Sequence, residues 1–240
     1  MGIKFLVTLI TLICSQTLFA GVIVTGTRII FPSDQQAVTV QLANPLEVPA
    51  LVQGWLDNGD SKTIPDANEV PFILTPPLVQ IEPKKGQMIR IIAKDVDQLP
   101  KDRESIYWFN ILDIPPVATE KTDENKLQVS IRTRLKLIYR PVKLEMGQEK
   151  AFKALKFKYL SDSKEIRVDN PSPYYINFYD LDLKSEKQET FVHTDPVMIA
   201  PYASDKFKIN INFIPVRVGV NLINDYGSNQ SYDYNIENIK

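Results

Sequence analysis

Few side chains in this sequence have types and spacings that support catalysis. The 240 residues include one histidine, His193, and one cysteine, Cys14. No Gly-x-Ser-x-Gly, His-Glu-x-x-His or phosphate-loop pattern occurs. The acidic residues include no pair whose spacing argues for acid–base chemistry. We therefore predict a protein that is not an enzyme, with no catalytic residue, small-molecule substrate, metal or cofactor.

The pattern that stands out is a long alternation of side chains between residues 127 and 140. The odd positions are Leu127, Val129, Ile131, Thr133, Leu135, Leu137 and Tyr139, and six of the seven even positions are polar. A period of two indicates a β-strand with one apolar face. At about 3.3 Å per residue it would span roughly 46 Å, whereas a usual strand has about 5 to 6 residues.

The two ends of this segment are predicted to differ in role. Leu135, Leu137 and Tyr139 fit an ordinary core. Leu127, Val129 and Ile131 follow a polar loop at 118–126, so the strand is expected to overrun its sheet there. An exposed edge offers an apolar row and free backbone groups to a partner, the interaction called β-augmentation. The same row could pair with a second copy of the chain, so self-association of the protein without its partner is an open alternative.

Charge and composition narrow the class of partner. The formal net charge of −1 and the isoelectric point near 6.0 provide no basic field for nucleic acid. Seventeen prolines exceed nine glycines, and ten tyrosines accompany many Val, Ile and Thr residues. Such a composition favours strands and tight turns over helices.

The first twenty residues have the features of a cleavable signal peptide. Lys4 precedes an apolar stretch at 5–13, and Ala20 ends a plausible cleavage segment. A membrane anchor is the alternative, although the stretch is short for a span. Cleavage after Ala20 would remove Cys14 and leave a mature chain without cysteine. Export without disulfides suggests the periplasm of a bacterium.

The rest of the chain consists of short β-type segments separated by Pro, Asn, Asp and Gly. We expect one strand over 22–31, an edge strand over 72–81 interrupted by two prolines, and an alternating strand over 207–213. No amphipathic helix of substantial length is predicted. The sequence therefore predicts an all-β protein of two immunoglobulin-like sandwiches, over residues 21–141 and 142–240.

One segment carries a specific family resemblance. Residues 99–116, Leu-Pro-Lys-Asp-Arg-Glu-Ser-Ile-Tyr-Trp-Phe-Asn-Ile-Leu-Asp-Ile-Pro-Pro, resemble the signature of the periplasmic pilus-assembly chaperones, the PapD-like family of the chaperone-usher pathway. Further matching segments are Thr27-Arg28 and residues 135–141, 170–175 and 223–227. The resemblance implies two immunoglobulin-like domains in an L-shaped arrangement with a cleft between them. It also implies a chaperone that binds, folds and caps pilus subunits and delivers them to an outer-membrane usher.

The resemblance assigns roles to particular residues. Arg28 and Lys136 match two cleft cations that bind the terminal carboxylate of the subunit. Leu127, Val129 and Ile131 match the side chains that the chaperone's strand lends to an incomplete subunit.

Three further residues match a structural feature of the family. Glu104, Arg140 and Asp225 correspond to a buried ion network between the two domains. The short loop at 117–126 and the absence of a cysteine pair resemble the short-loop branch of the family.

A structural protein is the nearest alternative function. The chain could be a pilus subunit or a surface adhesin built of immunoglobulin-like domains. Subunits lack their final strand, whereas this sequence has an unusually long one at 127–140 and a second domain. We therefore favour the chaperone interpretation.

Overall fold

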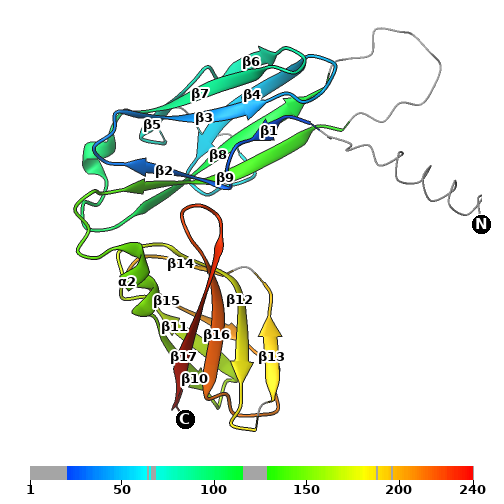
Figure 1. The fold of residues 1–240 in the computed structure, drawn as a ribbon. Coiled ribbons are helices and arrows are strands. Elements are labelled where there is room, and N and C mark those ends of the chain that lie inside the picture. Colours follow the sequence, from blue (N-terminus) through cyan, green and yellow to red (C-terminus); the bar gives the residue numbers. More distant parts are fainter. Residues whose placement is uncertain are drawn as a thin grey trace, which may run out of the picture.

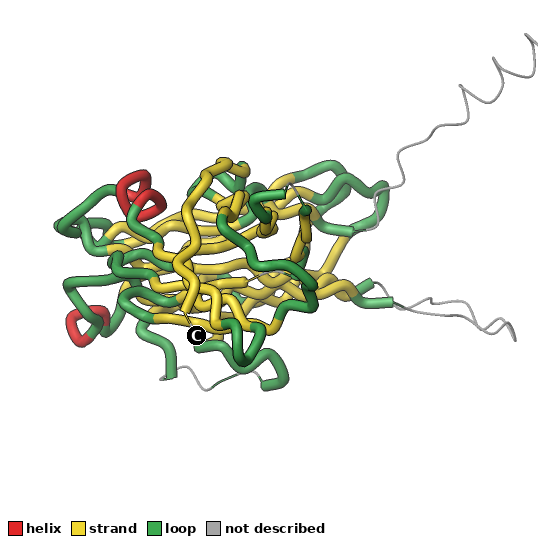
Figure 2. Tube along the Cα trace, turned by 90° about the horizontal axis from the view of Figure 1, so that it is seen from below, coloured by secondary structure: helices red, strands yellow, loops and turns green. Residues whose placement is uncertain are grey.

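The structure is a computed structural model that describes residues 21–63, 65, 69–115, 129–187, 189–195 and 197–239. The segment expected to be a signal peptide lies outside these residues. Strands make up most of the described chain, as Figure 2 shows. The helices in it are a 3-10 turn, η1 (Val96–Gln98), and a short α-helix, α2 (Gln148–Lys153). The prediction of an all-β protein is confirmed.

The N-terminal domain consists of two facing sheets. One has the strand order β1 (Ile23–Val24), β3 (Ala37–Ala43), β7 (Gly86–Ala93) and β5 (Phe72–Thr75). The other has the order β2 (Arg28–Pro32), β9 (Ile131–Arg140), β8 (Ser105–Ile114), β4 (Ala50–Asp57) and β6 (Leu78–Ile81).

The first expected strand, 22–31, is in fact two strands in different sheets. β1 pairs with β3 in one sheet, and β2 pairs with β9 in the other. Between them Gly26 has a φ of 90°, a conformation that glycine adopts without steric cost. The prediction of one continuous strand was wrong because a period-two pattern does not show where a strand changes sheet.

The prolines at 76 and 77 also separate two strands, β5 and β6. Each lies at the edge of its sheet. The predicted edge position is confirmed, and its physical reason is that proline has no N–H to donate to a neighbouring strand.

The core of this domain lies between the two sheets and is formed by alternate residues of the central strands. Phe31, Phe109 and Leu137 are completely buried. The rings of Phe31 and Phe72 have centroids 5.2 Å apart. Burial of each such side chain contributes about 1.5–3 kcal/mol. The core therefore holds β2, β8 and β9 in fixed positions beside the second domain.

The C-terminal domain is a single curled sheet preceded by α2. Its strand order is β13 (Thr190–His193), β12 (Ile176–Lys184), β16 (Arg217–Ile223), β17 (Asn229–Ile239), β10 (Lys156–Leu160), β11 (Glu165–Asp169) and β15 (Ser204–Lys208), and β14 (Val197–Ile199) pairs with β12. The long strand β17 pairs with β16 over its first half and with β10 over its second. β17 therefore joins the two layers of this domain around one core.

The alternating strand expected over 207–213 ends early. β15 stops at Lys208, which pairs with Glu165 at the start of β11. Ile209 and Ile211 continue as buried side chains outside any strand. The prediction was wrong past Lys208 because β11 provides no further residues with which to pair.

The two domains meet at β2, at β9 and at the segment just before β8. In Figure 1 the turn between β16 and β17 extends from the lower domain toward β2 and β9 of the upper one. Gly227 in this turn has a φ of 79°, and a Cβ atom there would clash with the side chain of Thr27. The backbone N–H of Glu104 donates to the carbonyl of Pro173 at 2.9 Å. The interface therefore joins segments that lie far apart in the sequence.

Candidate functional site

Arg28 and Lys136 lie directly opposite each other on the parallel strands β2 and β9. Their neighbours Ile29 and Leu137 are buried in the core. Because side chains alternate between the two faces of a strand, both cations project from the opposite, outer face of the sheet. The structure thus brings together the two cations that the sequence predicts to act as a pair.

The surroundings of this cation pair come from the second domain. Arg28 Nη1 donates to the backbone carbonyl of Ile223 on β16 at 3.3 Å. Lys136 Nζ donates to Asn177 Oδ1 on β12. Within the described residues, the buried Arg28 Nε has no hydrogen-bond partner. The cation pair therefore lies at the junction of the domains and retains capacity to bind an acceptor.

Burial and nearby positive charge lower the pKa values of both Lys136 and Arg28. Burial is the main reason why the pKa of Lys136 falls from 10.5 to about 8, and the neighbouring Arg28 charge adds to it. Burial also lowers the pKa of Arg28, although Asp225 and Glu104 partly offset the effect. In the described part of the chain neither cation forms an ion pair. A carboxylate between them would gain charge-assisted hydrogen bonds from both.

The predicted donor segment lies at the free end of β9. Val129 is 62% exposed and Ile131 is 40% exposed, which is unusual for large apolar side chains in a strand region. The last pair between β8 and β9 joins Asp113 to Ile131. Beyond it, the described residues provide no further strand partner for Val129. Leu127 and the loop at 117–126 lie outside the described residues.

The predicted ion network lies between the domains. Arg140 Nε contacts Glu104 Oε1 at 2.6 Å, and its two terminal nitrogens contact the carboxylate of Asp225 at 2.6 and 2.7 Å. Glu104 also accepts the backbone N–H of Tyr175 at 2.7 Å. Gln148 donates to Asp225 at 2.8 Å. The three predicted residues are therefore in direct contact and link both domains.

In this network, burial disfavours the charged form of each group, and the ion pairs among the three residues favour it. Burial raises the pKa of Glu104, which is only 2% exposed, and the charge of Arg140 opposes the rise. Burial also acts to raise the pKa of Asp225, but the hydrogen bonds and charge of Arg140 outweigh it and hold the pKa below its usual range. Burial alone would lower the pKa of Arg140, yet its two carboxylate partners raise it.

Sequence reasoning missed Asn177 and Trp108. Asn177 is buried and accepts the hydrogen bond of Lys136. Trp108 pairs across the sheet with Lys136, whose Nζ lies 5.9 Å from the centre of the indole ring. A polar residue between Ile176 and Phe178 was a usable signal for Asn177, because buried polar groups need partners. Nothing in the local pattern indicated Trp108.

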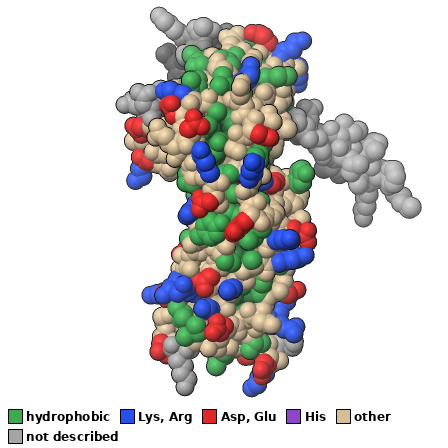
Figure 3. Space-filling view, turned by 90° about the vertical axis from the view of Figure 1, so that its left-hand side faces the viewer, with side chains coloured by type: hydrophobic (Ala, Val, Ile, Leu, Met, Phe, Trp, Pro, Cys, Tyr) green, Lys and Arg blue, Asp and Glu red, His purple; other side chains and the backbone are tan. Residues whose placement is uncertain are grey.

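In the part of the chain that the structure describes, His193 and the acidic side chains do not form a second site of this kind. His193 stacks on Phe207 at 5.2 Å between ring centres. The described residues contain no cluster of His, Cys, Asp and Glu suited to a metal ion, and no helix among them is long and apolar enough to cross a bilayer. On the face drawn in Figure 3, Lys and Arg side chains are interspersed with Asp and Glu.

Comparison with known proteins identifies the family. Residues 21–145 match the family model described as pili and flagellar-assembly chaperone, PapD N-terminal domain, and residues 150–234 match the model of the PapD C-terminal domain. The chain therefore belongs to the PapD-like family of pilus-assembly chaperones. This is a family of chaperones and not of enzymes, and both of its domains are present. The alternative that the chain is itself a pilus subunit or an adhesin is thus disfavoured.

Individual relatives agree with this assignment. The chain is 41% identical over 200 residues to the probable fimbrial chaperone YadV of Escherichia coli K12, covering 82% of this chain and 80% of that protein. It is 40% identical over 225 residues to the chaperone HifB of Haemophilus influenzae, covering 91% and 89%. The crystal structure of YadV superposes with a TM-score of 0.76 at 39% identity, over 90% of this chain and 99% of that one.

Proposed function

We propose that the protein captures pilus subunits in the periplasm by donor-strand complementation and passes them to an outer-membrane usher. The single observation that carries the proposal is the exposure of the apolar side chains of Val129 and Ile131 at the point where the pairing of β9 with β8 ends. Donor-strand complementation between chaperones and pilins is an established form of β-augmentation. A structure of the Salmonella enterica SafA pilin in complex with the SafB chaperone, at 24% identity and a TM-score of 0.73, has the same fold.

Capture would have two physical components. Backbone groups of the donor segment would pair with a strand of the subunit, and Leu127, Val129 and Ile131 would fill its open groove. Each buried side chain contributes about 1.5–3 kcal/mol before the cost of ordering the two chains. An incomplete subunit would thereby lose its exposed apolar groove, the surface through which it would otherwise aggregate.

The cation pair would set the register of this pairing. Arg28 and Lys136 would bind the terminal carboxylate of the subunit, with about 1.5–3 kcal/mol per charge-assisted hydrogen bond. A slip of one residue would turn polar Ser130 and Arg132 toward the apolar groove. Anchoring the carboxylate at a fixed point on β9 would therefore select the face that the donor segment presents.

The remaining assignments complete this proposal. We place the domain boundary at Pro141, with domains over 21–141 and 142–240, and the signal peptide at residues 1–20. The network of Glu104, Arg140 and Asp225 would hold the two domains at a fixed orientation. A fixed orientation is needed because Arg28 and Lys136 contact acceptors in the second domain.

The proposal is tested by mixing the mature protein with a pilus subunit refolded from denaturant. We expect an equimolar complex on size-exclusion chromatography and slower amide hydrogen exchange at residues 129–131 in that complex. Subunit alone should aggregate under the same conditions. A complex that forms without protection of residues 129–131 would disprove capture by this strand.

A further inference from the structure

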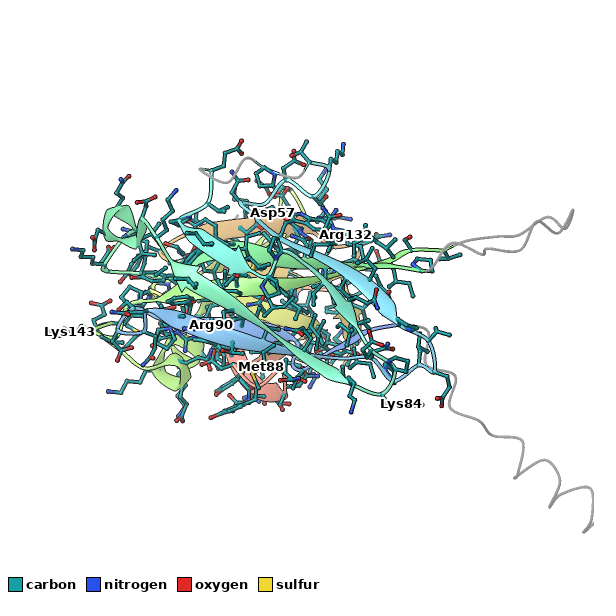
Figure 4. All side chains as sticks on the ribbon, turned by 90° about the horizontal axis from the view of Figure 1, so that it is seen from above. Asp57, Lys84, Met88, Arg90, Arg132 and Lys143 are labelled. Atoms are coloured by element: carbon teal, nitrogen blue, oxygen red, sulfur yellow. The ribbon has the colours of Figure 1, made fainter. Side chains whose placement is uncertain are left out.

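A second polar cluster lies on the outer face of the five-stranded sheet, next to the donor end of β9. Asp57, the last residue of β4, is 0% exposed. Its carboxylate accepts hydrogen bonds from Arg134 at 2.5 and 3.2 Å and from Asn110 at 2.8 Å. Arg132 donates twice to Asn110 Oδ1, at 2.7 and 3.1 Å, and lies 3.7 Å from Asp57. Figure 4 labels Asp57 and Arg132 on the same side of the domain.

Both arginines are further held by aromatic rings and by the loop after β4. The guanidinium of Arg132 lies 4.9 Å from the ring centre of Trp55, and that of Arg134 lies 4.0 Å from the ring centre of Trp108. Arg132 donates to the carbonyl of Ser61 at 2.5 Å, and Arg134 donates to that of Gly59 at 3.1 Å. The planar guanidinium suits such stacked and forked contacts, so neither arginine can be moved without losing several of them.

The position of this cluster coincides with the less supported half of β9. Residues 136–139 pair with β2 on one side and β8 on the other, whereas residues 131–135 pair only with β8. The donor half of the strand therefore has one ladder of backbone hydrogen bonds in place of two. Side-chain contacts from Arg132 and Arg134 to the covered carboxylate of Asp57 lie on this half of the strand, and releasing them would leave that carboxylate without its charged partners.

We propose that Asp57, Arg132 and Arg134 form a clamp that fixes the face and register with which β9 presents Val129 and Ile131 to a pilus subunit. The inference rests on the proposed function. Arg132 and Arg134 are positioning residues, since their side chains point to the face opposite the donor side chains. Trp108 joins the clamp to the cation pair, because it lies against both Arg134 and Lys136.

The first test uses the free protein and amide hydrogen exchange. Asp57→Asn keeps the shape of the side chain and removes its charge. We expect exchange at residues 131–135 to accelerate about tenfold while exchange at residues 137–139 stays unchanged. Arg167→Gln is the matched control, because it removes a 2.6 Å contact to Asp169 on β11, far from β9.

Unchanged exchange at residues 131–135 would overturn the clamp. Arg132→Gln provides a second variant in case Asp57→Asn does not fold, since it removes the guanidinium contacts and leaves Asp57 paired with Arg134. The same acceleration is expected for it, at a smaller amplitude.

The second test reads the register in the complex. A cysteine placed at Val129 is cross-linked to single cysteines along the matching strand of a refolded pilus subunit. With the native clamp we expect one dominant cross-link, and with Asp57→Asn we expect the yield to spread to neighbouring positions and capture to weaken about tenfold. A role in general stability alone would lower the melting temperature without spreading the cross-links.

The two possible failures can be told apart. If the wild-type protein shows no protection of residues 129–131 by the subunit, donor-strand capture is wrong and the clamp inference fails with it. If wild-type protection is normal and the cross-link pattern is unchanged in Asp57→Asn, only the clamp is wrong.

Discussion

Two groups of charged side chains lie at the junction of the domains, and they differ in how their charges are compensated. Arg140 contacts the carboxylates of both Glu104 and Asp225 within 2.7 Å. Among the described residues, the hydrogen-bond acceptors of Arg28 and Lys136 are uncharged, namely the carbonyl of Ile223 and the amide of Asn177. A buried charge without a counter-ion is costly. The first group therefore suits a structural role, and the second suits a site that is completed by an anion from a partner.

The largest expected effect comes from disrupting the compensated group. Asp225→Ala should lower the free energy of unfolding by about 3 kcal/mol, because it leaves the buried Arg140 with Glu104 alone. Thermal unfolding should shift down by roughly 6–12 °C. Glu149→Ala is the control, since its ion pair with Lys153 is exposed and contributes little. An unchanged melting curve for Asp225→Ala would contradict a structural role for the network.

Removing Arg28 or Lys136, the group without a carboxylate partner, should have a small effect on stability and a larger effect on subunit binding. Lys136→Ala should change the free energy of unfolding by less than about 1 kcal/mol but weaken subunit binding by about 1.5–3 kcal/mol, the worth of a charge-assisted hydrogen bond. Binding is measured by titration with a refolded subunit. Lys101→Ala, at an exposed position, is the control. Normal binding by Lys136→Ala would remove the distinction between the two groups.

The donor residues differ from both charged groups, because substituting them should weaken subunit binding without changing the contacts at the domain junction. Ile131→Asp should weaken subunit binding by about 1.5 kcal/mol or more and leave the melting temperature unchanged, since the side chain is already 40% exposed. Met88→Asp is a matched control on β7, where the side chain is 63% exposed and lies in the other sheet (Figure 4). A large loss of stability in Ile131→Asp would show that the residue belongs to the core.

The smallest expected effect is a pH dependence of subunit affinity and of stability, which arises from Lys136. The pKa of Lys136 is about 8 in the folded protein, against an ordinary 10.5. Binding of a carboxylate needs the charged form, so subunit affinity should fall as the pH rises through about 8. The free energy of unfolding should change in the opposite direction. Between about pH 8 and 10.5, Lys136 binds more protons in the unfolded chain than in the folded protein, so stability should rise with pH. Equal pH profiles for wild type and Lys136→Met would contradict both expectations.

The sequence was informative about strand faces and less so about strand ends. The alternation over 127–140 predicted which side chains of β9 share a face, and Leu137 and Tyr139 are indeed buried while Val129 and Ile131 are exposed. The strand itself begins at Ile131, which pairs with Asp113, the next-to-last residue of β8. Likewise, 22–31 looked continuous although Gly26 divides it between two sheets.

In the candidate site, too, the sequence indicated some of the residues and only the fold revealed the others. Family resemblance pointed to Arg28 and Lys136, and to Glu104, Arg140 and Asp225, as two separate groups. The sequence positions of Asn177, Trp108 and Asp57 did not connect these residues to either group, because they come from strands that meet only in the folded chain.

What the sequence by itself determined is the alternation of β9 and the identity of the charged residues, since side-chain direction in a strand follows from the period of two. Tertiary structure alone decided which of those charges are compensated. Within the described parts of the chain, Arg140 contacts two carboxylates and Lys136 contacts none, because the register of β2 and β9 and the docking of the second domain fix their neighbours. Compensation depends on distances of a few ångströms, which local sequence does not specify.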